Sequence, residues 1–161
     1  MRKILTSLLI VAILATSVVC CVACQKDKVV DSALDVLDKL AADGTIVFEH
    51  SFNEQYQSES IIKVSVGDTT IENDYAANSY LTYYVNIDDV DYVDYTVDPI
   101  TYEGETFYLA GTTLEKIPSC DTLKILFVQT IWNGEFTSSE VGKDKAILIS
   151  LPNEAKATTL N

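Results

Sequence analysis

The sequence predicts a mainly β (α+β) protein, with an N-terminal amphipathic helix packed on an antiparallel sheet or β-sandwich built of hairpins. Three observations lead to this fold class. The hydrophobic period is helical before Gly44 and changes to two, the period of a half-buried strand, after it. Turn dipeptides separate most of the later apolar stretches. Strands and helices do not alternate along the chain, so a parallel sheet of βαβ units is not expected.

The first 24 residues have the layout of an export signal, with a positive start followed by a long apolar stretch. The apolar stretch ends in the sequence Cys21-Val22-Ala23-Cys24. This sequence resembles the lipobox of bacterial lipoproteins, in which a small residue precedes the cysteine that receives the lipid. The resemblance implies a signal peptide over residues 1–23, lipidation of Cys24 and a short tether over residues 24–28.

Two other fates of this segment stay open. Ordinary cleavage near Ala23 would release a secreted protein, whereas an uncleaved apolar span over residues 4–24 would form a transmembrane anchor. In all three cases the domain is exported, because the positive N-terminus stays on the cytoplasmic side. Cys120 is a free thiol if Cys24 carries lipid, and a disulfide between them becomes possible if Cys24 is unmodified. We expect lipid anchoring on the outer face of a bacterial membrane.

A helix is predicted over residues 29–42, at the start of a single domain that spans residues 29–161. Its apolar positions recur at helical spacing and are Val30, Ala33, Leu34, Leu37, Leu40 and Ala41. Aspartates occupy the opposite face, and Gly44 follows as a candidate C-cap. Because that polar face is mostly acidic, we expect the apolar stripe to pack on the sheet and not on a membrane surface.

Nine or ten short strands are predicted after the helix. Their expected ranges are 45–52, 61–66, 69–72, 79–87, 90–97, 100–102, 105–110, 123–132, 135–141 and 146–151. Two-residue turns should join four pairs of strands, at Gly67-Asp68, Asp88-Asp89, Glu103-Gly104 and Asn133-Gly134. Residues 123–128 are apolar on both faces, which predicts a central strand covered on both sides. The pattern Thr112-x-x-Glu115 predicts a capped single helical turn.

The charge of the chain argues against some classes of function. Without the first 23 residues it has nine Lys, no Arg and 24 acidic residues, a formal charge of −15. No basic stripe is available for phosphate contacts, so nucleic-acid binding is not expected. A strongly negative surface attracts cationic molecules instead. We expect the partner to be a protein or glycan of the cell envelope or the extracellular space, with a cationic partner favoured.

The candidate binding surface is an acidic, tyrosine-rich region over residues 80–108. Its candidate contact residues, together with the single tryptophan, are Tyr84, Asp88, Asp89, Asp91, Tyr92, Asp94, Tyr95 and Trp132. Tyrosine beside Asp and Asn is suited to sugar stacking or to a protein interface. The alternative interpretation is a solvated acidic rim whose tyrosines only favour strand formation. The function predicted from this region is a non-catalytic binding or interaction module.

A Ca²⁺-dependent binding module is an alternative for the same region. Seven carboxylates lie between residues 86 and 105, and Ca²⁺ takes six to eight oxygen ligands. The candidate ligands are Asp88, Asp89, Asp91 and Asp94. Their order does not match an EF-hand loop, because Val90 stands at the fifth position and no glycine follows it. Apart from this ion, no cofactor is expected.

Catalysis is poorly supported by the sequence. His50 is the only imidazole, and in a strand it points away from its neighbours Glu49 and Ser51. A small secreted hydrolase or thiol enzyme would need His50 beside a nucleophile such as Cys120. The sequence has no phosphate-binding glycine loop, no zinc-protease motif and no nucleophile-elbow motif. We therefore predict no catalytic residues, and we keep a His50 enzyme as a further alternative.

Overall fold

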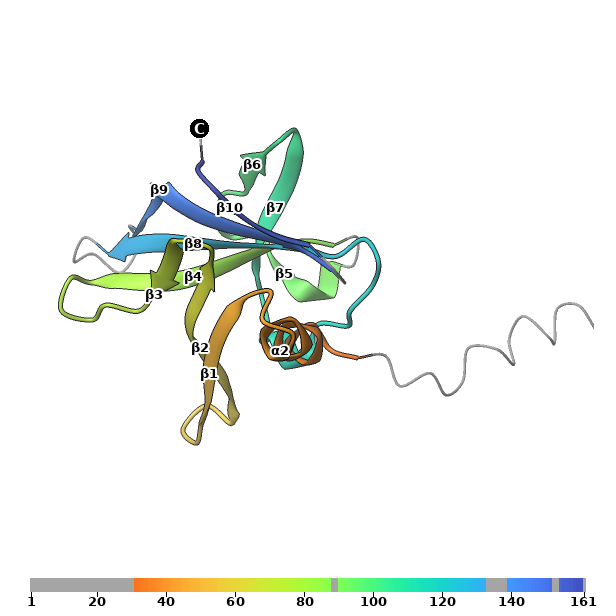
Figure 1. The fold of residues 1–161 in the computed structure, drawn as a ribbon. Helices are drawn as coiled ribbons and strands as arrows, with labels where there is room; N and C mark the ends of the chain where they lie inside the picture. Colours follow the sequence, from red (N-terminus) through yellow and green to blue (C-terminus); the bar gives the residue numbers. More distant parts are fainter. Residues whose placement is uncertain (1–30, 88–89, 133–138, 152–153, 161) are drawn as a thin grey trace, which may run out of the picture. The chain divides into compact units, whose positions relative to one another are not determined.

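The computed structural model describes residues 31–87, 90–132, 139–151 and 154–160. These residues form one α-helix, two short 3-10 turns and two antiparallel sheets (Figure 1). The mainly β class predicted from the sequence is therefore confirmed. The expected signal peptide over residues 1–23 and the tether over residues 24–28 lie outside the described residues. In the part of the chain that is described, no helix is long and apolar enough to cross a membrane.

The elements follow one another along the chain with short connections. Their bounds are α2 (Ala33–Ala42), β1 (Val47–Asn53), β2 (Ser58–Val66), β3 (Thr69–Glu72), β4 (Ser79–Asn86), η1 (Val90–Tyr92), β5 (Val93–Asp94), β6 (Ile100–Tyr102), β7 (Glu105–Ala110), η2 (Leu114–Lys116), β8 (Lys124–Trp132), β9 (Ser139–Ser150) and β10 (Glu154–Thr158). The smaller sheet has the order β1-β2-β3. The larger has the order β10-β9-β8-β4-β7-β5, with β6 paired to β7.

Strand β8 lies in the interior of the larger sheet and is covered on both faces, as predicted. Ile125 and Phe127 point into a core cluster on one face, whereas Leu126 and Val128 belong to a second cluster on the other. All four side chains are completely buried. The alternation of strand side chains therefore divides one apolar run between two cores.

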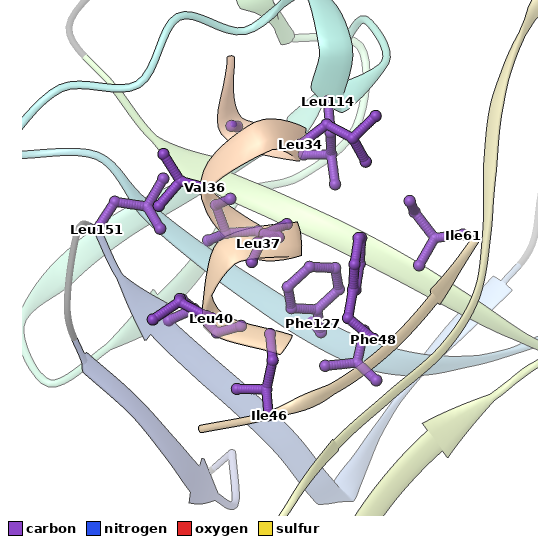
Figure 2. Packing of buried hydrophobic residues seen from close by; sticks show 14 of the residues in the cluster. Leu34, Val36, Leu37, Leu40, Ile46, Phe48, Ile61, Leu114, Phe127 and Leu151 are labelled. Carbon is purple, nitrogen blue, oxygen red and sulfur yellow. The ribbon is translucent and has the colours of Figure 1, made fainter. Parts of the chain in front are cut away.

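The first core lies between the larger sheet and the layer formed by α2 and the smaller sheet (Figure 2). Leu37 of α2 and Phe48 of β1 belong to the same buried cluster as Phe127. The helix begins with a capping box, in which the Asp35 amide donates to Ser32 Oγ at 3.1 Å and the Ser32 amide donates to Asp35 Oδ2 at 2.8 Å. The Ser32 hydroxyl also donates to Asp35 Oδ2 at 2.7 Å, and this hydrogen bond and the one from the Ser32 amide lower the pKa of Asp35. Gly44, with φ +76°, follows the helix end.

The second core lies on the opposite face of the larger sheet. Tyr84, Phe107 and Leu148 are buried there, and Leu160 near the end of the chain packs over them. The β6–β7 hairpin contributes Ile100 and Tyr102. The Tyr102 hydroxyl is hydrogen-bonded to the Thr158 hydroxyl, which ties the hairpin to β10.

Two of the predicted hairpin turns are confirmed by the strand registers. Gly67-Asp68 joins β2 to β3 through the pair Val66↔Thr69, with Gly67 at φ +56° as a II′ turn requires. Glu103-Gly104 joins β6 to β7, with positive φ at both residues as in a I′ turn. The turns at Asp88-Asp89 and Asn133-Gly134 lie outside the described residues.

The strand predicted over residues 90–97 is wrong. The chain instead makes the η1 turn and the two-residue strand β5, which pairs with β7 and not with β4. Asp94 explains why the strand stops, because its Oδ1 accepts hydrogen bonds from the Thr96 amide at 2.8 Å and from the Thr96 hydroxyl at 2.6 Å. A side chain that binds the backbone two residues later closes a turn and competes with strand pairing.

The C-terminal part of the sheet also differs from the prediction. Residues 139–150 form one long strand, β9, although the sequence predicts a break between 141 and 146. The polar residues 142–145 stay within the strand because its register with β8 shifts between Val128 and Thr130. Gly142 lies so close to β8 that a Cβ at this position would be 3.1 Å from the Gln129 carbonyl oxygen. The edge strand β10 was not predicted, because its residues have little strand propensity and it forms by pairing with β9.

The helical turn near Thr112 is present, but its cap differs from the prediction. The turn is η2, and its N-cap is Thr113, whose side chain makes no capping hydrogen bond. The Glu115 side chain instead accepts a hydrogen bond from the Glu59 amide of β2 at 3.3 Å. Glu115 therefore joins η2 to the smaller sheet.

Candidate binding surfaces

The structure does not bring the predicted contact residues together on one surface. Tyr84 is only 4% exposed and belongs to the second core, so it is a core residue and not a surface contact. Tyr92 is half-buried and packs against the first core, on the opposite face of the sheet. Asp88 and Asp89 lie outside the described residues.

We use the name β5–β7 patch for two tyrosines that contact each other at the edge of the larger sheet and for two aspartates that lie close to them in the sequence. Its members are Asp91, Asp94, Tyr95 and Tyr108. Tyr95 is 58% exposed, and its ring meets that of Tyr108 edge to face at 4.9 Å between centroids. The two hydrogen bonds from Thr96 lower the pKa of Asp94, so this carboxylate stays charged. Asp94 pairs with Leu109, which points to the face of the sheet opposite to that of its neighbour Tyr108.

Trp132 lies away from the β5–β7 patch. Asp94 pairs with Leu109 of β7, Leu109 pairs with Tyr84, and Tyr84 pairs with Leu126 of β8. These pairs place Asp94 level with Leu126 across the sheet. Trp132 lies six residues beyond Leu126 along β8, which is a distance of about 20 Å. It is half-buried there, and its amide donates to the Asn78 carbonyl at 2.9 Å.

The Ca²⁺ alternative gains no support from the described residues. Among them, no group of three or more His, Cys, Asp or Glu side chains is placed to hold a metal ion. Asp91 is exposed on η1, and Asp94 uses one oxygen to close the turn with Thr96.

His50 lies between two carboxylates from different elements. Its Nδ1 is 2.9 Å from Glu59 Oε2 of β2, and its Nε2 is 3.0 Å from Asp38 Oδ1 of α2. Carboxylates only accept hydrogen bonds, so both contacts are satisfied together when the ring carries two N–H groups and is positively charged. Burial lowers the pKa of His50, but the hydrogen bonds and charges of Glu59 and Asp38 outweigh it, so the pKa lies above its ordinary value.

This geometry gives His50 a structural role and leaves neither ring nitrogen facing a nucleophile. A catalytic His50 would first have to give up one of its two carboxylate contacts. The exposed Cys120 lies in the connection before β8, with its sulfur 3.5 Å from the Thr122 hydroxyl, and the His50 nitrogens contact carboxylates and not this thiol. The partners of His50 lie nine and twelve residues away, on β2 and α2, and only the packing of these elements on β1 brings them to the ring, so no local sequence pattern indicated them.

A groove of about 370 Å³ lies where β3 meets the ends of β4, β8 and β9. We call it the β3–β9 groove, and among its lining residues are Glu72, Asp74, Gln129, Ile131, Gly142 and Asp144. Local sequence patterns carry no signal for this groove, because its residues come from segments far apart in the chain. Only the pairing of the strands unites them.

A second groove, of about 610 Å³, is lined by residues of β8, β9 and β10 and by Glu103, and it has two lysines in its wall. Lys124 donates to Glu105 Oε2 at 2.6 Å, and Lys156 donates to Glu103 Oε2 at 2.8 Å. Each ammonium is therefore neutralised within the protein, and the groove has no unpaired positive charge with which to recognise an anion.

Comparisons with protein-family models, with curated proteins and with solved structures found no match for this chain. The assignment of function therefore depends on the chemistry of these surfaces.

Proposed function

We propose that the protein is an exported, lipid-anchored interaction module that binds a cationic partner and catalyses no reaction. The observation that best supports this proposal is the β5–β7 patch, where the exposed ring of Tyr95 contacts that of Tyr108, with Asp91 and Asp94 close to Tyr95 in the sequence. Tyrosine supplies a large apolar contact with a polar tip and is enriched at protein interfaces. The formal charge of −15 on residues 24–161 would steer a basic partner toward this surface and repel polyanions.

The anchor in this proposal is a lipid on Cys24. The first described residue, Asp31, is fixed to the domain because its carbonyl accepts a hydrogen bond from the Ser119 amide at 2.8 Å. An extended chain spans at most about 3.5 Å per residue, so the seven-residue step from Cys24 to Asp31 would hold the domain within about 25 Å of the lipid. The partner is therefore sought in the cell envelope.

The proposal also includes the N-terminal amphipathic helix packed on the sheet, which is α2 (Ala33–Ala42). The start predicted at residue 29 is wrong, because Ser32 has an extended backbone and is the N-cap of the helix. Helix α2 begins two residues after Asp31, and the Ala33 amide donates to the Ile117 carbonyl at 2.8 Å. In this proposal α2 is the first element of the folded domain after the tether.

A triple substitution in the β5–β7 patch tests the binding function. Asp91→Asn, Asp94→Asn and Tyr95→Ala together should weaken the binding of octalysine to the full-length lipoprotein in detergent micelles by about tenfold, since two charge contacts and one aromatic contact are lost. The Asp94→Asn change keeps a side-chain oxygen that can accept from Thr96, so the turn should survive. Fluorescence anisotropy of labelled octalysine measures the affinity.

The matched control makes the same changes at exposed positions outside the patch. Asp43→Asn, Asp68→Asn and Tyr56→Ala remove the same charge and the same type of ring. We expect the control to change affinity by less than about threefold. Equal losses in the two triple variants would show that octalysine responds only to net charge, and the patch would then have no specific role.

A further inference from the structure

We propose that the β3–β9 groove binds the side chain of a lysine or arginine from an extended segment of a protein partner. The inference extends the proposed function to a second surface, and it rests on that function only for the positive charge of the ligand. Three features of the groove support the proposed binding: an apolar floor, carboxylates in the walls, and no aromatic side chain among the described residues that line it.

The floor forms where the smaller sheet stops covering the larger one. Strand β3 is four residues long, and the Gln129 side-chain amide of β8 donates to the Glu72 carbonyl at its end, at 3.1 Å. Beyond this contact, Ile131 of β8 is 47% exposed although it lies in the sheet, and it lines the groove together with Gly142 of β9. Since Gly142 has no side chain, the floor is low and apolar at this point. An alkyl chain can therefore lie along it.

The walls of the groove have an excess of negative charge. Glu72, Asp74 and Asp144 line it, and Lys145 is the one basic residue among the lining residues that the structure describes. Asp74 Oδ1 accepts hydrogen bonds from the Ala76 and Ala77 amides, both at 3.1 Å. Within the described residues, the side chains of Glu72 and Asp144 make no hydrogen bond or ion pair. They are therefore available to a cation from outside.

An apolar floor between carboxylate walls fits a long cationic side chain better than other ligands. The methylene groups of lysine or arginine would lie over Ile131, and the charged end would reach the carboxylates. The walls would repel an anion. Among the described residues that line the groove none is aromatic, so these residues offer a sugar ring no stacking surface. The volume of about 370 Å³ is at the small end of the range for ligand sites, which suits one side chain.

A single-charge probe and its uncharged analogue test this inference. We would titrate the isotope-labelled full-length lipoprotein in micelles with Nα-acetyl-lysine methylamide and follow the backbone amide resonances by NMR. The expected result is a set of shifts centred on Gln129, Ile131 and Gly142, saturating at millimolar probe. The norleucine analogue, which has the same alkyl chain without the ammonium, should shift these resonances at least tenfold less at equal concentration.

Charge-matched double variants locate the binding site. The double variant Glu72→Gln, Asp144→Asn should lower the affinity of the lysine probe by about tenfold. The control variant Glu54→Gln, Asp68→Asn, at exposed positions outside the groove, should change that affinity by less than about twofold. Equal effects of the two pairs, or shifts scattered over exposed acidic residues, would overturn the inference. Shifts confined to the β5–β7 patch would overturn it too, while leaving the proposed function intact. Loss of octalysine binding in the patch variant, with lysine-probe shifts retained at the groove, would support both surfaces as separate sites. Unchanged octalysine binding in the patch variant, with the same shifts retained, would support the groove alone.

Discussion

Phe127→Ala should lower the free energy of unfolding by about 3–5 kcal/mol. The Phe127 side chain is completely buried, and its ring lies 6.0 Å from that of Tyr83 on the neighbouring strand. Figure 2 shows it in one cluster with Leu37 of the helix and Phe48 of the smaller sheet. Truncation would remove apolar contacts to the helix and to both sheets at once and leave a cavity where they meet. Urea unfolding followed by circular dichroism measures the change.

Two further variants make this result interpretable. Phe52→Ala removes the same ring from a side chain that is 56% exposed, and it should cost less than about 0.5 kcal/mol. Phe127→Leu keeps most of the volume and should cost about 1–1.5 kcal/mol, so the trend is measurable even if Phe127→Ala does not fold. Similar losses for Phe127→Ala and Phe52→Ala would show that α2 and the smaller sheet do not pack on β8.

His50→Gln should lower the free energy of unfolding by about 1–2 kcal/mol at pH 6 and by much less at pH 9. The charged ring holds α2 and β2 together through Asp38 and Glu59. Because folding raises the pKa of His50, its stabilisation is fully present below the ordinary value near 6.5 and is lost as the pH rises through the folded pKa. The wild type should therefore lose stability over this range, and His50→Gln should lose less.

The pH dependence separates this ion pair from simple packing. Phe127→Leu should keep the wild-type slope of stability against pH, because it leaves His50 and both carboxylates in place. Asp38→Asn should reduce the slope, since one of the two charges that raise the pKa of His50 is removed. Parallel curves for wild type and His50→Gln between pH 6 and 9 would mean that the ring is not held as a charged bridge. Thermal unfolding at a series of pH values gives these curves.

Local patterns in the sequence were sufficient to predict much of the fold. The doubly apolar run before residue 128 indicated a central strand, and the dipeptides at Gly67 and Glu103 indicated the turns, because each signal arises within a few residues. The strand predicted over residues 90–97 failed for a local reason, the turn closed by Asp94. Strand β10 was missed for a non-local one, because its formation depends on β9 as a partner.

The candidate sites were less predictable because they depend on which face of the larger sheet is covered. Alternation along β4 shows that Tyr83 and Tyr84 point in opposite directions. It does not show that Leu160, near the end of the chain, closes the second core over Tyr84. In the same way, Glu72 and Asp144 meet at one groove only because β3 ends where β9 passes. Side chains brought together by long-range pairing leave no spacing in the sequence.

The intact mass of the native protein, extracted from the membranes of the cell that produces it, tests the proposed export and anchoring most directly. We predict a chain that begins at Cys24 and carries a diacyl or triacyl addition, with Cys120 labelled by a thiol-specific alkylating reagent without prior reduction. A chain that begins near Cys24 without lipid, and that is two mass units lighter than its reduced form, would instead indicate a secreted protein closed by a disulfide between Cys24 and Cys120. That result would contradict the lipid anchor.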